Sequence, residues 1–89
     1  MPRQRPQDSA IIDEFGRRLA EVRREIGLSQ DQLGELIGVQ DKHISNIERG
    51  EVQPTLCTVV RLLTALDVTP DDLMGGIADP QVRTRHDLE

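Results

Sequence analysis

The chain has 89 residues, of which 36% are apolar. A chain of this size can form one small hydrophobic core, which excludes two independent domains. Sixteen acidic residues against eleven basic ones give a net charge of −5. This charge excludes indiscriminate binding to polyanions, so any affinity for nucleic acid must come from a local surface. Phe15 is the one aromatic residue, which excludes the stacking platforms that bind single-stranded nucleic acid.

The composition gives little support for a metal site, a disulfide or a membrane-spanning segment. Cys57 is the single cysteine, so no internal disulfide can form, and His43 and His86 are too far apart to complete a zinc site with it. We expect an exposed Cys57 thiol, with a redox role as the less favoured alternative. Apolar runs fall short of the roughly 20 residues that cross a bilayer, and no apolar stretch follows the N-terminal arginines. We expect a cytoplasmic protein without metal, cofactor or membrane partner.

Residues 1–8 contain prolines and arginines but nothing to bury, which predicts a flexible basic arm. Apolar residues at steps of three and four then predict a first helix, capped by Asp8 or Ser9 and ended by Gly27. The predicted buried stripe of this helix consists of Ile11, Ile12, Phe15, Leu19, Val22 and Ile26.

Two short helices follow. Residues 29–32 form a capping box, with the Ser29 and Gln32 side chains bonding each other's backbone N–H, and Gly38 ends this second helix. Its predicted buried residues are Leu33, Leu36 and Ile37. A third helix over 41–49 has only Ile44 and Ile47 as apolar anchors, so most of its surface is expected to be exposed.

The last predicted helices lie between Thr55 and Gly76. Thr55 caps a fourth helix, and Thr69 with Pro70 starts a short fifth one. The predicted buried stripe of the fourth helix is Leu56, Val59, Val60, Leu63 and Leu66. No segment shows strand-like alternation. The prediction is a compact all-α domain of five helices over residues 9–76, preceded by the arm and followed by a tail over 77–89 that stays extended or folds on a partner.

The second and third helices, joined around Gly38, match a helix-turn-helix, which presents its second helix to the DNA major groove. With the isoleucines of the third helix in the core, its opposite face carries polar residues of the types that bind base edges or phosphate. We expect base reading by Asp41, Lys42, Ser45 and Asn46, and phosphate binding by Arg49 together with Gln40 and Thr55 at helix starts. The alternative is an ordinary solvated helix face.

This pattern resembles the Xre/Cro family of phage-repressor-type regulators. The resemblance runs from about residue 14 to residue 74 and rests above all on Leu28–Ser29–Gln30 and Ile47–Glu48–Arg49–Gly50 at this spacing. It implies a five-helix repressor-like domain that binds operator DNA as a symmetric dimer. It also implies that Gln30 contacts phosphate, that Asp41, Lys42 and Asn46 read bases, and that Arg23 and Glu48 form a structural salt bridge.

Two positions depart from the family pattern. Gly34 stands where the family usually has alanine, which predicts a less stable second helix. Asp41 places an acid at the end of the third helix that faces the groove, where it suits the helix dipole but repels phosphate. Arg17 has two competing interpretations, ion pairs with glutamates along the first helix or a phosphate contact.

The sequence contains no arrangement of nucleophile, base or paired carboxylates that predicts an enzyme. It favours a transcriptional regulator that binds specific double-stranded DNA, a repressor or autoregulator acting as a homodimer on a palindromic operator. The controller of a restriction-modification system is a special case of this interpretation. The alternative is an antitoxin-like or adaptor protein whose main partner is another protein, with DNA binding serving autoregulation. The fifth helix and the tail are the candidate dimer surface.

Overall fold

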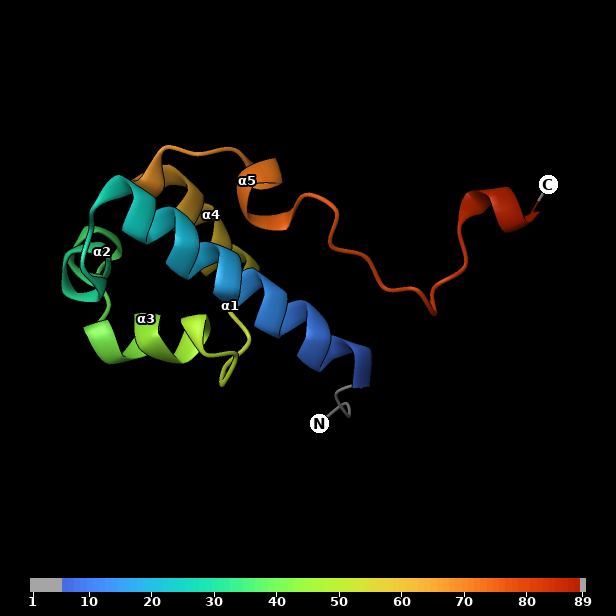
Figure 1. Ribbon diagram of the computed structural model, residues 1–89, viewed down its shortest axis with the longest axis horizontal. Coiled ribbons are helices and arrows are strands. Elements are labelled where there is room, and N and C mark those ends of the chain that lie inside the picture. The colour runs from blue at the N-terminus through green and yellow to red at the C-terminus, as the bar shows by residue number, and fades with distance from the viewer. Residues whose placement is uncertain (1–5, 89) are drawn as a thin grey trace.

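A computed structural model describes residues 6–88 (Figure 1). Its helices are α1 (Pro6–Ile26), α2 (Gln30–Ile37), α3 (Asp41–Glu48), α4 (Leu56–Leu66) and α5 (Pro70–Met74), followed by the 3-10 turn η1 (Arg85–Leu88). The described residues contain no strand, so the prediction of an all-α fold with five helices is confirmed. In the same residues no helix has the length and apolarity needed to span a membrane.

The first helix begins earlier than the sequence predicted. α1 starts at Pro6 rather than after a cap at Asp8 or Ser9, so the end of the predicted arm is helical. Proline suits a first helical turn because the N–H that it lacks has no intrahelical partner there. Asp8 in the same turn places a negative charge near the positive end of the helix dipole. Residues 1–5 of the predicted arm lie outside the described residues.

The predicted start and end of the second helix are confirmed. The Ser29 hydroxyl accepts from the Gln32 N–H at 3.0 Å, and the Gln32 side chain accepts from the Ser29 N–H at 2.8 Å. Gly38 ends α2 in the left-handed region, with φ of 79°. These two devices hold α2 to eight residues and direct the chain into α3.

Gly34 allows α2 to lie directly against the turn that leads to α3. A Cβ at this position would stand 2.5 Å from the Val39 carbonyl oxygen, and the Val39 N–H donates to the Gly34 carbonyl at 2.8 Å. The sequence predicted that this glycine weakens the helix. The structure adds that the missing side chain makes room for the turn, a packing contact that helix propensity does not capture.

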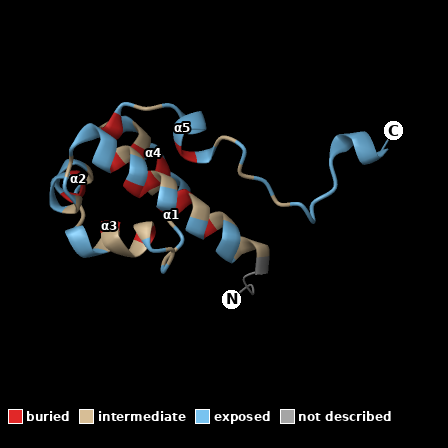
Figure 2. Cartoon of the chain, viewed as in Figure 1, coloured by how far each residue is buried: buried red, intermediate tan, exposed pale blue. Residues whose placement is uncertain are grey.

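The core lies between α1 and the other four helices (Figure 2). Its members without exposed surface come from all five helices, and each contributes roughly 1.5–3 kcal/mol by burial. They are Leu19, Leu33, Ile44, Ile47, Leu62 and Leu73. The two predicted anchors of the third helix, Ile44 and Ile47, are among them.

Four residues of the predicted buried stripes are exposed instead: Ile26 by 47%, Leu36 by 59%, Leu56 by 78% and Val60 by 53%. Leu62, which the predicted stripe omitted, is completely buried.

α4 has two apolar stripes, and this explains why Leu56 and Val60 were predicted to be buried and Leu62 was not. One stripe runs through Leu56, Val60 and Leu63, and the other through Val59, Leu62 and Leu66. Because both are apolar, the periodicity of the sequence does not choose between them. Packing of the helices buries the second stripe.

After α5 the chain leaves the bundle. Ile77 still packs against the core, whereas residues 80–88 are exposed and extend away from the helices before ending in η1 (Figures 1 and 2).

Candidate nucleic-acid interface

α3 has a firmly buried inner side. It packs against both α1 and α2 through Ile44 and Ile47, neither of which has exposed surface. Gly16 of α1 permits the close approach, because a Cβ at this position would collide with the Ile47 carbonyl oxygen and stand 2.7 Å from that of Glu48. With the inner side held in place, the helical period presents the polar residues of α3 on its outer side.

The polar residues of α3 differ in how far they are exposed. Asp41 and Lys42 are exposed, whereas Ser45 and Asn46 are half-buried. The Asp41 carboxylate accepts from the Lys42 N–H at 2.9 Å, which holds this acid at the start of the helix, where the dipole favours negative charge. Among the described residues the Lys42 ammonium has no ion-pair partner. Lys42 is therefore available to a ligand.

Arg49 orients the Asn46 amide. Arg49 Nη2 donates to Asn46 Oδ1 at 3.0 Å and lies 3.3 Å from the Glu51 carboxylate. Since the amide oxygen faces Arg49, the Nδ2 group of Asn46 is left to donate elsewhere. The sequence predicted Arg49 only as a phosphate contact. The i, i+3 spacing of Asn46 on α3 and Arg49 at its C-cap was the signal for this pairing.

Arg23 and Glu48, which the resemblance pairs, are bonded across the bundle. Arg23 Nε donates to Glu48 Oε2 at 2.6 Å and Nη2 donates to Oε1 at 3.0 Å. The two side chains are only 9% and 4% exposed, and the remaining guanidinium nitrogen donates to the Leu28 carbonyl at 2.7 Å. Hydrogen bonding to Glu48 raises the pKa of Arg23 above its ordinary value. The pair joins the C-terminal parts of α1 and α3.

Gln30 belongs to the same cluster, which sequence reasoning missed. Its Nε2 donates to Glu48 Oε1 at 2.9 Å, so Glu48 accepts from α1 and α2 at once. An amide nitrogen carries two protons, and this bond uses one of them. Gln30 can therefore keep its bond to Glu48 and donate its second proton to an anion.

Gln40 and Thr55 stand at the N-caps of α3 and α4. Gln40 makes no capping hydrogen bond with its side chain. The Thr55 hydroxyl accepts from the Thr58 N–H at 3.1 Å and donates to the Thr58 hydroxyl at 3.0 Å. Helix geometry leaves the N–H groups of a first turn without intrahelical acceptors, and such groups suit phosphate. At Thr55 the backbone, rather than the occupied hydroxyl, is the anion-binding element.

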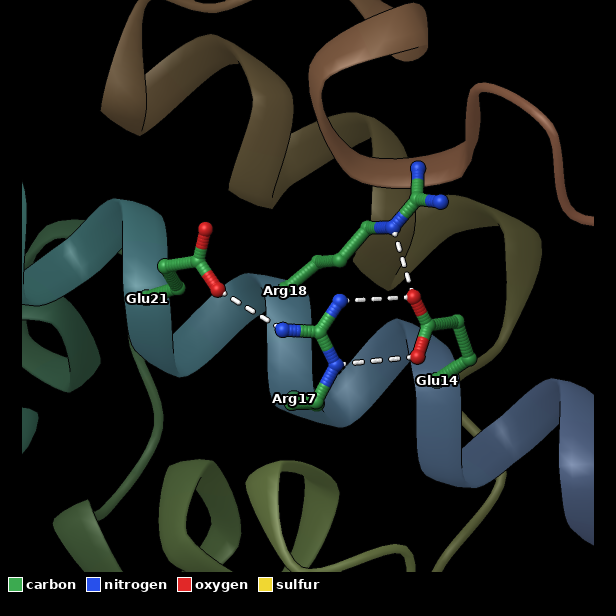
Figure 3. A network of polar contacts seen from close by, with 4 residues as sticks. All are labelled: Glu14, Arg17, Arg18 and Glu21. Carbon is green, nitrogen blue, oxygen red and sulfur yellow. Dashed lines mark hydrogen bonds and ion pairs between the residues drawn. The ribbon is translucent and has the colours of Figure 1, made fainter.

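Arg17 lies in a network of ion pairs along α1 (Figure 3). It bonds the Glu14 carboxylate at 2.8 and 2.9 Å and Glu21 at 2.8 Å, and Arg18 also donates to Glu14, at 3.0 Å. Hydrogen bonds from Arg17 and Arg18 lower the pKa of Glu14 to about 2. This arrangement agrees with the helix-pair interpretation of Arg17. A phosphate contact would require Arg17 to give up these bonds.

The fold and this polar helix define a helix-turn-helix protein. Residues 14–74 match the family of helix-turn-helix domains, and the chain belongs to this family. The resemblance to phage-repressor-type regulators is thereby confirmed.

One curated relative and two solved structures are similar to this chain in sequence or fold. The transcriptional regulator PuuR of Escherichia coli is 44% identical over 48 residues, which are 54% of this chain and 26% of PuuR. The chain thus spans about a quarter of that relative. The restriction-modification controller protein C.AhdI of Aeromonas hydrophila is 38% identical, with a TM-score of 0.70 over 73% of this chain and 94% of the controller. The c2 repressor of phage P22, solved with a synthetic operator, is 34% identical, with a TM-score of 0.62 over 68% of this chain and 94% of the repressor chain.

Proposed function

We propose that this protein is a sequence-specific DNA-binding transcriptional regulator, a repressor or autoregulator, that places α3 in the major groove of double-stranded DNA. The observation that carries the proposal is the division of α3 into two sides. Ile44 and Ile47 hold it rigidly to the core, while Asp41, Lys42, Ser45 and Asn46 form the polar side. A helix backed in this way can enter the groove without refolding. The P22 repressor, of similar fold, has been solved with its operator.

In this proposal three side chains carry distinct tasks. Lys42 donates to guanine or to phosphate, and Asn46 donates through Nδ2 to an acceptor on a base edge. Gln30 donates its second amide proton to a phosphate while Glu48 holds the first. Ser45 and Asp41 complete the reading surface, and the first turns of α3 and α4, at Gln40 and Thr55, supply backbone N–H groups to the sugar-phosphate chain.

We further propose a homodimer on a palindromic operator, located in the cytoplasm and without catalytic activity. One α3 contacts only a few base pairs, so two copies related by a two-fold axis are needed to give specificity. The half-sites would then be about 10 base pairs apart, or a multiple of that spacing, so that both helices face the same side of the duplex.

Selection of bound duplexes from a random library tests the proposal and reads the half-site directly. Against the selected duplex we expect Lys42→Ala and Asn46→Ala each to lose about 1–3 kcal/mol of binding free energy and to relax selectivity at one base pair. Gln30→Ala is expected to weaken binding equally for all sequences, because phosphate contacts carry no base information.

Gln81→Ala, which removes an exposed amide after α5, is the matched control and is expected to bind like the parent. Circular dichroism checks that each variant is folded. If folded Lys42→Ala and Asn46→Ala proteins bind the selected duplex as tightly as the parent, α3 does not read the bases.

Two more specific roles remain within the same fold. The similarity to C.AhdI supports the control of restriction-modification genes as a special case. The exposed segment 80–88, with Val82 56% and Leu88 83% exposed, supports an antitoxin-like or adaptor role in which this segment folds on a protein partner. Purification from the native host separates them, because a stoichiometric second protein supports the adaptor role and its absence counts against it.

A further inference from the structure

An apolar surface outside the DNA-facing helix lies where α2 packs against α4. Leu36 on α2 and Val60 on α4 are both more than half exposed, and Leu56 lies one turn before Val60 on the same side of its helix. Ile37 and Ala65 are half-buried beside them. We call this surface, formed by Leu36, Ile37, Leu56, Val60 and Ala65, the α2–α4 face. Its side chains are apolar enough to belong in a core, yet the described residues of the chain do not cover them.

Leu36 projects from α2 with 59% of its surface exposed and lines two hollows. The first, of about 250 Å³, is lined by residues of both helices: Leu36, Ile37, Val60, Arg61, Thr64 and Ala65. The second, of about 550 Å³, shares Leu36 with the first and is lined by Leu28, Gln32, Glu35 and Leu36. The face thus presents both a projecting leucine and an apolar hollow of a size to receive one.

Each hollow contains one charged side chain, and the two charges are opposite. Arg61 lines the first hollow and Glu35 lines the second. Both side chains are exposed, and within residues 6–88 neither forms an ion pair. Glu35 directly precedes Leu36 on α2, so a group that receives Leu36 also lies close to Glu35.

We propose that the α2–α4 face binds a second copy of this chain through a two-fold symmetric contact. Leu36 of each copy enters the first hollow of the other, and this places Glu35 beside Arg61 of the partner subunit. A two-fold axis repeats the same pair on its other side, so the contact contains two equivalent ion pairs around an apolar centre. The projecting Leu36 fits the hollow of the other copy, and Glu35 meets Arg61, so the surface is complementary to itself. A second copy therefore fits it better than an unrelated protein.

This contact assigns a surface to the homodimer of the proposed function. It differs from the surface predicted from the sequence, which was the fifth helix and the tail. None of the side chains of the face belongs to the set proposed to contact DNA; Leu56 adjoins that set only through the backbone of the first turn of α4. Self-association can therefore be measured without DNA, and its failure would leave the base-reading proposal intact.

The test is sedimentation equilibrium of the full-length chain, without DNA, over a concentration series. We expect a monomer–dimer equilibrium that Leu36→Lys abolishes. Glu35→Arg alone and Arg61→Glu alone are each expected to raise the dimer dissociation constant by about tenfold or more, because each places like charges opposite one another twice. The double variant Glu35→Arg/Arg61→Glu restores opposite charges and is expected to return the constant to within about threefold of the parent value.

Val82→Lys is the matched control, since it changes an equally exposed apolar residue on the segment after α5. It is expected to associate like the parent, with all variants folded by circular dichroism. A parent chain that stays monomeric up to about 1 mM would overturn the proposal. It would also be overturned if the double charge exchange did not restore association, or if Val82→Lys abolished association while Leu36→Lys did not.

Discussion

Glu48 connects three helices through one carboxylate. It accepts from Arg23 on α1 and from Gln30 on α2 while lying itself at the end of α3, so this side chain ties the C-terminal end of the proposed recognition helix to both other helices. Removing one partner of a buried ion pair costs more than the pair contributes, because the other charge stays buried without compensation.

Arg23→Met is therefore expected to lower the free energy of unfolding by about 3–5 kcal/mol, since the Glu48 carboxylate keeps its burial and loses its cation. Urea denaturation followed by circular dichroism measures the change. Arg24→Met, at an exposed position of the same helix, is the control and is expected to stay within about 0.5 kcal/mol of the parent. If both variants lost the same free energy of unfolding, the Arg23–Glu48 pair would contribute no more to stability than an exposed arginine.

Glu14 gives stability a dependence on acid pH. Its pKa in the folded chain is about 2, against an ordinary value of 4.5, so the folded state favours the ionised form. The contribution is present above pH 4.5 and is lost progressively as the pH falls from 4.5 through 2, below which both states are protonated. Glu14→Gln is expected to flatten the dependence of the urea midpoint on pH in this window. The effect is expected to shrink in high salt, because the network lies on the surface. A Glu14→Gln protein with the pH dependence of the parent would contradict this assignment.

At the scale of the helices, α1 and α3 pack closely at Gly16, where the Ile47 carbonyl leaves no room for a side chain. Alanine favours a helix over glycine by about 1 kcal/mol, but the new methyl group would overlap the carbonyl of Ile47 and push the two helices apart. Overpacking of this kind costs about 1–3 kcal/mol. The carbonyl belongs to the backbone and cannot rotate away as a flexible side chain would.

Gly16→Ala is accordingly expected to be destabilised by about 1–2 kcal/mol in urea denaturation, as the overpacking exceeds the gain in helix propensity. It is also expected to weaken binding to the selected duplex, because α3 is displaced. Ser9→Ala, at an exposed position of α1, gains propensity without a clash and serves as the control. A Gly16→Ala protein that is more stable than the parent would show that α3 can move without cost.

Some helix boundaries were predicted correctly from the sequence. The capping box of α2 and the end of that helix at Gly38 depend on residues within four positions of one another, so the sequence predicts them correctly. The start of α1 and the buried side of α4 were predicted wrongly. α1 begins at Pro6 because proline suits a first turn. In α4 two apolar stripes fit the same period, so the buried side depends on what the helix packs against.

Across the whole molecule the charges are unevenly divided. Residues 41–50 contain two acids and two bases and are neutral, whereas residues 67–76 contain three acids and no base. The net charge of −5 therefore does not prevent α3 from docking on DNA, although it opposes indiscriminate coating. Most of the proposed phosphate donors are amides or backbone N–H groups, which release no counterions.

Apart from Arg17, only Lys42 and Arg49 carry positive charge among the residues expected to contact DNA, which makes four cations in a dimer. We expect log K against log salt to have a slope of about −4 in a variant with Arg3→Ala and Arg5→Ala, which removes the cations outside the described residues. Titration of the selected duplex at several salt concentrations measures it. A distinctly steeper slope would mean that further cations reach phosphate, with Arg17 released from Glu14 and Glu21 as the first candidate.

The features that depend on neighbouring residues could be predicted from the sequence: five helices, the caps of α2, α4 and α5, the turn at Gly38 and the polar side of α3 opposite Ile44 and Ile47. These follow from backbone preference and helical period, which act over a few residues. The folded structure alone reveals which stripe of α4 is buried, that Gln30 bonds Glu48, and that Leu36 and Val60 lie exposed side by side on packed helices. Each of these depends on contacts between segments far apart in the chain, and periodicity within a single helix carries no information about its neighbours.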